Sequence, residues 1–255
     1  MKILALETTG KYGSAAVIDD EGRIFCASSG EEMNHLRGMI LLIDEALVKA
    51  GAGKDELTHI AASAGPGSFT GIRIGVTTAR TMAQMLDLPC IAVSSVEALA
   101  EGSRRKASDE GAEYIVPVIN ARRHQTYAAA YAADQGVKAL TPALAEKQYM
   151  IEDLLEELKK MISGREGASA YFTGDGIDAY GEIIEDMMPE GSYLFADESV
   201  RYQSAEAVAA IALRKAAEGA TVAYDELLPE YMRLAEAEQR LKAGTLSDRI
   251  RTAKV

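Results

Sequence analysis

The feature that most constrains the fold is a glycine-rich stretch, Gly65-Pro66-Gly67-Ser68-Phe69-Thr70-Gly71-Ile72-Arg73-Ile74-Gly75. A short apolar run at 59–63 precedes it and predicts a strand, and the apolar spacing at 76–86 predicts a helix after it. Glycine accepts positive φ angles and lets another backbone approach closely. Ser68 or Thr70 can cap the helix. The stretch therefore predicts a strand, a tight turn and a helix that begins at the turn.

Two functions are open to such a turn. A helix N-terminus behind a glycine turn can bind a phosphate. However, no Lys-Ser or Lys-Thr follows the glycines, and Gly65, Gly67 and Gly71 do not have the spacing of a G-x-G-x-x-G motif. The spacing favours a tight turn that presents a helix, with a phosphate site as the alternative.

The composition limits the class of protein. The 255 residues are 48% hydrophobic, enough for one large or two small domains. The net charge of −12 argues against binding of nucleic acid by this chain alone. Cys26 and Cys90 lie in apolar runs, so we expect buried, reduced thiols rather than a bridge. We see no signal peptide and no run long enough to span a membrane, and we expect a cytoplasmic protein without a membrane partner.

The two halves of the chain follow the same order of predicted elements. The first half predicts three strands, then helix, strand, helix, strand and helix, at 2–6, 13–18, 23–27, 34–50, 59–63, 71–86, 90–93 and 96–102. The second half repeats this order at 114–119, 125–133, 137–140, 150–162, 170–173, 177–188, 193–195 and 205–219. An antiparallel start followed by strand–helix alternation predicts a mixed sheet flanked by helices. The sequence thus predicts a duplicated α/β domain.

A polar segment at 102–111 indicates the boundary between the halves. We therefore predict a first subdomain at 1–108, a second at 109–230 and a charged tail at 231–255. From residue 240 the tail carries five basic residues against one acid, Asp248. A solvated end is expected, and a basic arm for a partner or nucleic acid is the alternative.

The sequence shows no motif for a metal site or for a catalytic nucleophile. His35, His59 and His124 are far apart in sequence, and none has a histidine four residues away. The G-x-S-x-G motif of serine hydrolases is absent from the sequence. We predict no catalytic, metal-binding or cofactor-binding residue in the isolated chain.

The helix from Gly71 is predicted to have a second, uncharged face. The helix at 34–50 shows the same feature in weaker form, because Leu41 and Val48 share a face beside Arg37 and Asp44. In the helix from Gly71, one stripe is the natural core face: Ile72, Val76, Ala79, Ala83 and Leu86. The core stripe of the helix at 34–50 comprises Leu36, Met39, Ile40, Ile43, Ala46, Leu47 and Ala50. A further uncharged stripe indicates burial by a third layer of the chain or by another subunit. We favour a helix-to-helix interface with another subunit, formed by Leu41, Val48, Ile74, Thr78, Thr81 and Met85.

Several of these motifs together resemble those of the bacterial TsaB family, also called YeaZ. The glycine-rich stretch is the most specific part of the resemblance. Supporting motifs are Glu7-Thr8-Thr9, Ser94-Ser95-Val96-Glu97-Ala98-Leu99-Ala100, Asn120-Ala121-Arg122-Arg123, Gly174-Asp175-Gly176 and Pro229-Glu230-Tyr231-Met232-Arg233. The resemblance covers the chain to Arg233.

The resemblance implies an actin-like (ASKHA) α/β fold of two duplicated subdomains. It implies a role in forming threonylcarbamoyladenosine in tRNA, next to the anticodon. In that family the protein is a non-catalytic partner of TsaD, the enzyme that carries the metal, and a small ATPase, TsaE, joins the complex. It also implies a homodimer, contact with tRNA only through the complex, and room for ATP or ADP in the complex. TsaD holds its metal with a His-x-x-x-His motif, whereas here His35 is followed by Met39, so the metal site is not carried over.

Two departures bear on rival functions. The family usually has Asp in the first strand and Asp-Ala-Arg in the second subdomain, where this chain has Glu7 and Asn120. The lost charge at Asn120 weakens the case for an actin-like ATPase or kinase that would use Thr8, Thr9 and the glycine turn. A metalloprotease is the second rival, and the missing histidine pair argues against it.

Overall fold

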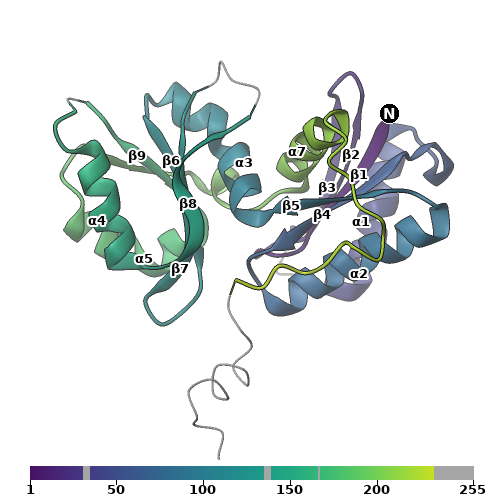
Figure 1. Cartoon of the computed structure of the whole chain (residues 1–255). Helices are drawn as coiled ribbons and strands as arrows, with labels where there is room; N and C mark the ends of the chain where they lie inside the picture. Colours follow the sequence, from purple (N-terminus) through teal and green to yellow (C-terminus); the bar gives the residue numbers. More distant parts are fainter. Residues whose placement is uncertain (31–34, 135–138, 166, 233–255) are drawn as a thin grey trace, which may run out of the picture.

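The computed structural model describes residues 1–30, 35–134, 139–165 and 167–232. Two five-stranded mixed sheets lie side by side, each flanked by helices (Figure 1). The first sheet has the order β3-β2-β1-β4-β5. Its strands are β1 (Lys2–Glu7), β2 (Ser14–Asp19), β3 (Ile24–Ser28), β4 (His59–Gly65) and β5 (Cys90–Ser94). β1 pairs antiparallel with β2 and parallel with β4.

The second sheet repeats this topology in the order β8-β7-β6-β9-β10. Its strands are β6 (Tyr114–Asn120), β7 (Gln125–Ala132), β8 (Thr141–Met150), β9 (Ala170–Thr173) and β10 (Tyr193–Phe195). The central strand again pairs antiparallel with the strand after it and parallel with a later one. The predicted duplication is confirmed, and the fold is actin-like.

Helices cover both faces of the first sheet. Along β1, Leu4 and Leu6 face α1 (His35–Ala50) and α2 (Phe69–Leu86), whereas Ile3 and Ala5 face α7 (Ala205–Ala217). This alternation is the period-two pattern of a strand buried on both sides. A short 3-10 helix, η1 (Lys54–Glu56), precedes β4.

The remaining helices are α3 (Ser95–Asp109), α4 (Ile151–Ile162), α5 (Gly176–Met187) and the short α6 (Glu198–Arg201). α3 lies between the two sheets and packs on β6 (Figure 1). Helices therefore exchange sides: α3 from the first half contacts the second sheet, and α7 from the second half packs on β1 and β2. A boundary between residues 108 and 109 separates the strands of the two sheets. The range 109–230 nevertheless includes α7, which packs on the first sheet.

Two predicted elements were wrong in extent or position. The helix predicted at 96–102 continues as α3 to Asp109, because Ser103 and Ala107 stay buried while Arg105 pairs with Asp109 on the outside. The strand predicted at 137–140 lies instead at β8, where most residues are exposed and no apolar run marks the strand. Residues 135–138 lie outside the described part of the chain.

The segment after α7 forms a strap along the first subdomain. Cys90 and Val222 exchange two backbone hydrogen bonds, of 2.8 and 2.9 Å between N and O. Leu227 is fully buried among the residues of α1 and α2, and the Glu230 N–H donates to the Ala64 carbonyl at 2.7 Å. Of the predicted tail at 231–255, only residues 231 and 232 are described. Figure 1 shows the strap ending between the two subdomains.

The core stripe of α2 has the predicted burial. Ile72, Val76, Ala79 and Ala83 are at most 1% exposed, and Leu86 packs at the edge of the same cluster. In α1, Met39, Ile43 and Ala46 are buried as predicted. The prediction was wrong for Ile40, which is 54% exposed, because Leu42 joins the buried cluster in its place. The side chain of Leu36 lies outside the described residues.

Cys26 and Cys90 are both free, as predicted, but Cys26 is only half-buried. Burial raises the pKa of each thiol to about 11. Within the described part of the chain, no helix is both long and apolar enough to cross a membrane.

The glycines at the start of α2 give the first prediction. A Cβ on Gly71 would overlap the carbonyl oxygen of Thr8, and one on Gly75 would overlap the Thr8 hydroxyl. Overpacking against backbone costs about 1–3 kcal/mol or more, so Gly71→Ala is expected to lower the free energy of unfolding by that amount in urea titrations.

Gly102, exposed inside α3, is the matched control: its Cβ would lie 3.6 Å from the Ala207 Cβ. Gly102→Ala is expected to stabilise the protein by about 0.5–1 kcal/mol. Equal effects at the two positions would contradict this account.

Candidate functional site

A cleft lies where the carboxyl ends of β1, β4, β6 and β9 meet between the subdomains. Open α/β sheets bind ligands at this end of their parallel strands. The cleft has a volume of about 930 Å³. Its lining comes from the turns after all four strands: Thr9, Gly10 and Lys11; Gly67, Ser68 and Phe69; Ile119, Asn120, Ala121 and Arg122; and Asp175, Asp178 and Ala179, together with Tyr127 of β7.

The polar residues after β1 are used to hold the fold. Glu7 is fully buried, and its Oε1 accepts hydrogen bonds from the Thr9 backbone N–H at 2.5 Å and the Thr9 hydroxyl at 2.6 Å. The Thr8 hydroxyl donates to the Gly71 carbonyl at 2.7 Å. Burial raises the pKa of the Glu7 carboxyl, and the hydrogen bonds from Thr9, Ser63 and Gly10 offset that only in part. Thr8 therefore fastens the end of β1 to the start of α2, and Glu7 holds the turn that follows β1.

An acid that the sequence analysis did not single out lies on the other wall. Asp175 Oδ1 accepts the backbone N–H of Asn120 at 2.9 Å, and burial raises the pKa of the Asp175 carboxyl. Asn120 Oδ1 in turn accepts the Arg122 N–H and the Tyr180 hydroxyl, at 2.8 and 3.0 Å. The sequence did contain a signal for the position of Asp175, because the Gly174-Asp175-Gly176 motif follows a predicted strand. Parallel neighbouring strands such as β6 and β9 end at the same edge of a sheet, which brings Asp175 close to Asn120.

The hairpin between β6 and β7 places a basic tip beside the cleft. Arg122, Arg123 and His124 all have left-handed backbones, with φ of 62°, 55° and 60°. Such conformations are rare for residues other than glycine. The Asn120 side chain supports the first of them through its bond to the Arg122 N–H. The hairpin thereby turns Arg122 into the cleft lining.

The actin-like fold implies a site for nucleotide with Mg²⁺, but the residues here do not fit one. Glu7, the acid at the end of β1, is buried, already hydrogen-bonded and shifted toward its neutral form. Mg²⁺ needs accessible oxygen ligands at short range. The corresponding position in the second subdomain is Asn120, which has no charge, and the nearby Asp175 is itself shifted toward neutrality. We derive no nucleotide-dependent step from this cleft.

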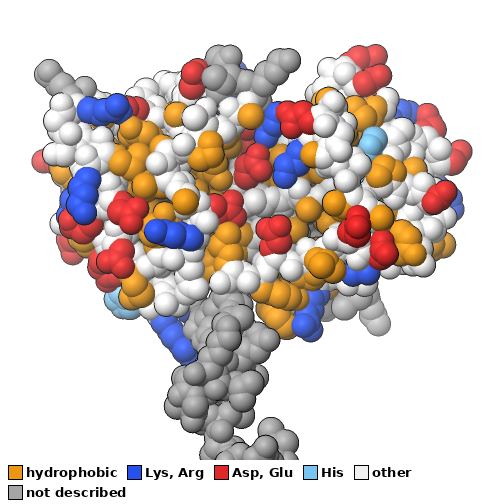
Figure 2. Space-filling model, in the orientation of Figure 1, with side chains coloured by type: hydrophobic (Ala, Val, Ile, Leu, Met, Phe, Trp, Pro, Cys, Tyr) orange, Lys and Arg blue, Asp and Glu red, His pale blue; other side chains and the backbone are white. Residues whose placement is uncertain are grey.

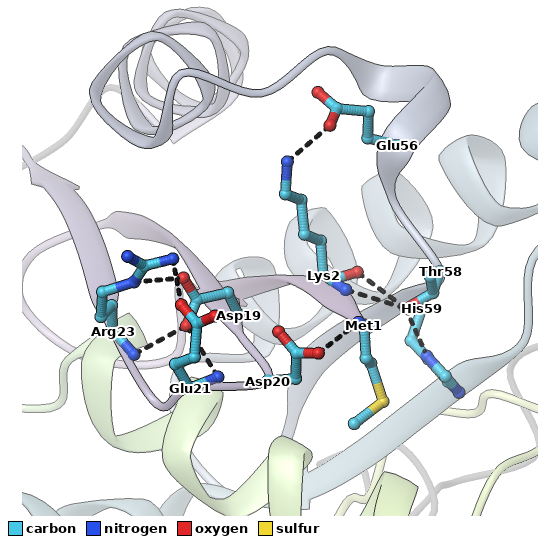
Figure 3. A network of polar contacts seen from close by, with 9 residues as sticks. All are labelled: Met1, Lys2, Asp19, Asp20, Glu21, Arg23, Glu56, Thr58 and His59. Carbon is cyan, nitrogen blue, oxygen red and sulfur yellow. Dashed lines mark hydrogen bonds and ion pairs between the residues drawn. The ribbon is translucent and has the colours of Figure 1, made fainter.

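His59 and His124 lie in different subdomains and are not brought together, and the side chain of His35 lies outside the described residues. His59 lies next to Thr58 beside β1, and His124 contacts Glu152, with 3.1 Å between Nδ1 and Oε1. Among the described residues, one trio of acids could share an ion: Asp19, Asp20 and Glu21. Figure 3 shows that Arg23 and the N-terminal amine already pair with these acids. They lie beside Lys2, at the end of the sheet opposite the cleft.

The residues predicted for a partner interface lie on the outside of the α1–α2 layer. Leu41, Val48 and Met85 are 69%, 79% and 81% exposed, Thr81 is exposed, and Ile74 and Thr78 are half-buried. α1 and α2 contact each other on the same face of the first sheet. In Figure 2, hydrophobic side chains reach the surface along the lower edge of the first subdomain, where Figure 1 places α2. Within the described residues, no third layer covers this face.

The buried carboxyl of Glu7 gives a pH prediction. Below the ordinary pKa of 4.5, Glu7 is neutral in both the folded and the unfolded chain. As the pH rises above 4.5, the unfolded chain loses this proton first, so the free energy of unfolding falls until the pH passes the folded pKa. Glu7→Gln, which keeps an acceptor for Thr9, is expected to gain stability relative to the wild type across this window. Urea unfolding from about pH 4 to about pH 8 measures it.

Exposed Glu56 is the control for Glu7, because Lys2 and the Gly53 N–H lower its pKa. Its contribution is present above pH 4.5 and is lost as the pH falls. Glu56→Gln is therefore expected to change the pH profile in the opposite direction. Parallel profiles for Glu7→Gln and the wild type would show that the Glu7 pKa is not raised.

The chain is similar in sequence to known proteins of tRNA modification. A family model described as TsaD, tRNA N6-adenosine threonylcarbamoyltransferase, matches residues 31–244. The chain is 31% identical over 240 residues to the tRNA threonylcarbamoyladenosine biosynthesis protein TsaB of Bacillus subtilis, covering 94% of this chain and 97% of that protein. It is 28% identical over 233 residues to the Escherichia coli protein of the same name, covering 91% and 95%.

The solved structure of YeaZ from Pseudomonas aeruginosa agrees with this likeness. It superposes with a TM-score of 0.71 at 26% identity, covering 90% of this chain and 99% of that one. Because the sequence matches run along nearly the whole length of both chains, the chain belongs to the TsaB (YeaZ) family.

Proposed function

We propose that this chain is a non-catalytic scaffold subunit that works with a TsaD-type enzyme in forming threonylcarbamoyladenosine in tRNA, next to the anticodon. Its named relatives are biosynthesis proteins for that nucleoside. It acts in the cytoplasm, meets tRNA through the complex, and dimerises with itself when the enzyme is absent. A TsaE-type ATPase joins the assembly, and ATP or ADP binds only there.

The observation that carries this proposal is the outer stripe of α2, which consists of Ile74, Thr78, Thr81 and Met85. The inner stripe is buried on the first sheet, so α2 needs no further contact to fold. Met85 is nevertheless 81% exposed, next to a helix that exposes Leu41 and Val48. Each aliphatic side chain that becomes buried contributes about 1.5–3 kcal/mol by transfer from water. Two such helices from each partner would form a four-helix contact.

The cleft supports the non-catalytic part of the proposal. Glu7, Thr8 and Asn120 occupy the positions from which an actin-like enzyme would handle a metal-bound nucleotide. Here Glu7 Oε1, Thr8 Oγ1 and Asn120 Oδ1 bond to the chain's own backbone. An autonomous ATPase or kinase would need these groups to reach the ligand.

The interface prediction uses a double variant, Ile74→Glu with Met85→Lys. It places charges in the proposed contact and leaves the inner stripe intact. Loss of about 3 kcal/mol of apolar burial corresponds to a Kd at least roughly 100-fold higher. Light scattering should then show a monomer, pull-down should lose the TsaD-type enzyme, and tRNA modification should fall.

Met150→Lys is the matched control, since Met150 is an exposed methionine of β8 in the other subdomain. It should leave association unchanged. Circular dichroism should show that the double variant is folded. A folded double variant that still dimerises and still binds the enzyme would place the interface elsewhere.

A second prediction concerns cofactors. The isolated chain is expected to hold no stoichiometric zinc or iron and to bind ATP weakly or not at all, because the residues at the cleft do not fit a metal-bound nucleotide. Elemental analysis and titration calorimetry with ATP and Mg²⁺ measure this. One tightly held metal per chain, or an affinity for ATP in the low micromolar range, would favour the ATPase or kinase.

A further inference from the structure

An exposed aromatic and cationic stack lies at the rim of the cleft. Phe69, at the start of α2, stacks on Tyr231 of the strap, with ring centroids 5.0 Å apart and planes at 29°. The Arg73 guanidinium lies 4.0 Å from the Phe69 centroid, and its Nε donates to the Tyr231 hydroxyl at 2.9 Å. The two rings are 48% and 41% exposed. Folding does not require large aromatic rings to stay in water, so this arrangement suits a ligand with a flat face.

A second aromatic and cationic group lies in the turn after β1. The Lys11 ammonium is 5.5 Å from the ring centroid of Tyr12 and 5.2 Å from that of Tyr202. The two rings meet edge to face at 5.5 Å. Lys11 lines the same cleft as Phe69 and Arg122. The cleft is therefore lined by a ring and a cation from each subdomain: Phe69 and Lys11 from the first, Tyr127 and Arg122 from the second.

The acids in the cleft lining are largely engaged. Asp178 pairs with Arg201 at 2.8 Å and accepts the Tyr202 hydroxyl at 2.9 Å. Asp175 accepts the Asn120 N–H, and its carboxyl is shifted toward the neutral form by burial. The lining thus favours an anion near Lys11 and Arg122, although the whole chain has a net charge of −12.

We propose that this cleft binds a single-stranded segment of RNA, with phosphates at Lys11 and Arg122 and an unpaired base on Phe69. Proteins recognise such segments by combining a cationic groove with exposed aromatic rings. The inference rests on the proposed function, since a tRNA modified next to its anticodon presents an unpaired loop. A free nucleotide is the less suitable occupant, because the ring stack lies at the exposed rim, Glu7 is buried and Asp178 is paired with Arg201. The overall negative charge keeps the affinity of the isolated chain low and makes the partner enzyme necessary for tight binding.

The test measures binding of a labelled anticodon stem–loop RNA by fluorescence anisotropy. It uses the full chain, both in complex with the TsaD-type enzyme and alone at low salt. Lys11→Ala with Arg122→Ala should weaken binding and reduce the slope of log K against log salt by about 1.4, or about 0.7 per lost phosphate contact. Phe69→Leu, which keeps an apolar side chain without a ring, should weaken binding by about 5-fold to 150-fold with little change in slope.

Two controls remove comparable groups that do not line the cleft: Lys54→Ala with Arg105→Ala, and Tyr224→Leu. Both should bind RNA as the wild type does. Pull-down of the enzyme by every variant separates this inference from the proposed function, because the cleft variants should keep the enzyme. Unchanged affinity and slope in the cleft variants, or no RNA binding by the wild type in either setting, would overturn the inference. Competition by ATP at low micromolar concentration would also overturn it, by making the cleft a nucleotide site.

Discussion

The contact between the end of β1 and the start of α2 is the constraint on which the rest of the structure depends. The Thr8 hydroxyl bonds to the Gly71 carbonyl, and the Thr8 backbone lies where a side chain at Gly71 would have to be. This approach is possible only because two glycines lie one turn apart on the same face of α2. It fixes the direction of the helix relative to the sheet. The residues beside this contact, Thr9 and 67–69, line the cleft. The contact also sets which stripe of α2 faces the solvent.

Two consequences follow from the fixed direction of α2. Its inner stripe packs on β1 and β4 beside α1, and this burial stabilises the first subdomain. Its outer stripe then has no partner among the described residues of the chain, which is the basis for a subunit interface. Because its N-terminus opens into the cleft, the helix connects the proposed interface to the proposed RNA site. A partner on the outer stripe would lie within one helix length of the cleft.

The exchange of helices joins the two subdomains into one unit. α3 buries Val96, Leu99 and Ala100 against the second sheet, while α7 buries Val208 and Ile211 against the first. The strap then returns along β5 to the glycine turn and ends against Phe69. Neither half of the chain therefore completes its own core, and the cleft lies where the two halves meet.

The sequence by itself determined the order of the elements, their duplication and the inner face of α2, because each depends on local periodicity and on turn residues such as Gly71 and Ser68. It also indicated the outer stripe, since a helical wheel needs no knowledge of the partner. Only the tertiary structure decided the length of α3, the position of β8 and the exposure of Ile40, because each depends on which neighbour covers a given side. The pairing of Asp175 with Asn120 and the stack of Tyr231 on Phe69 were also beyond the sequence. These contacts join residues 55 and more positions apart, and no local pattern encodes which distant groups the packing of two sheets will bring together.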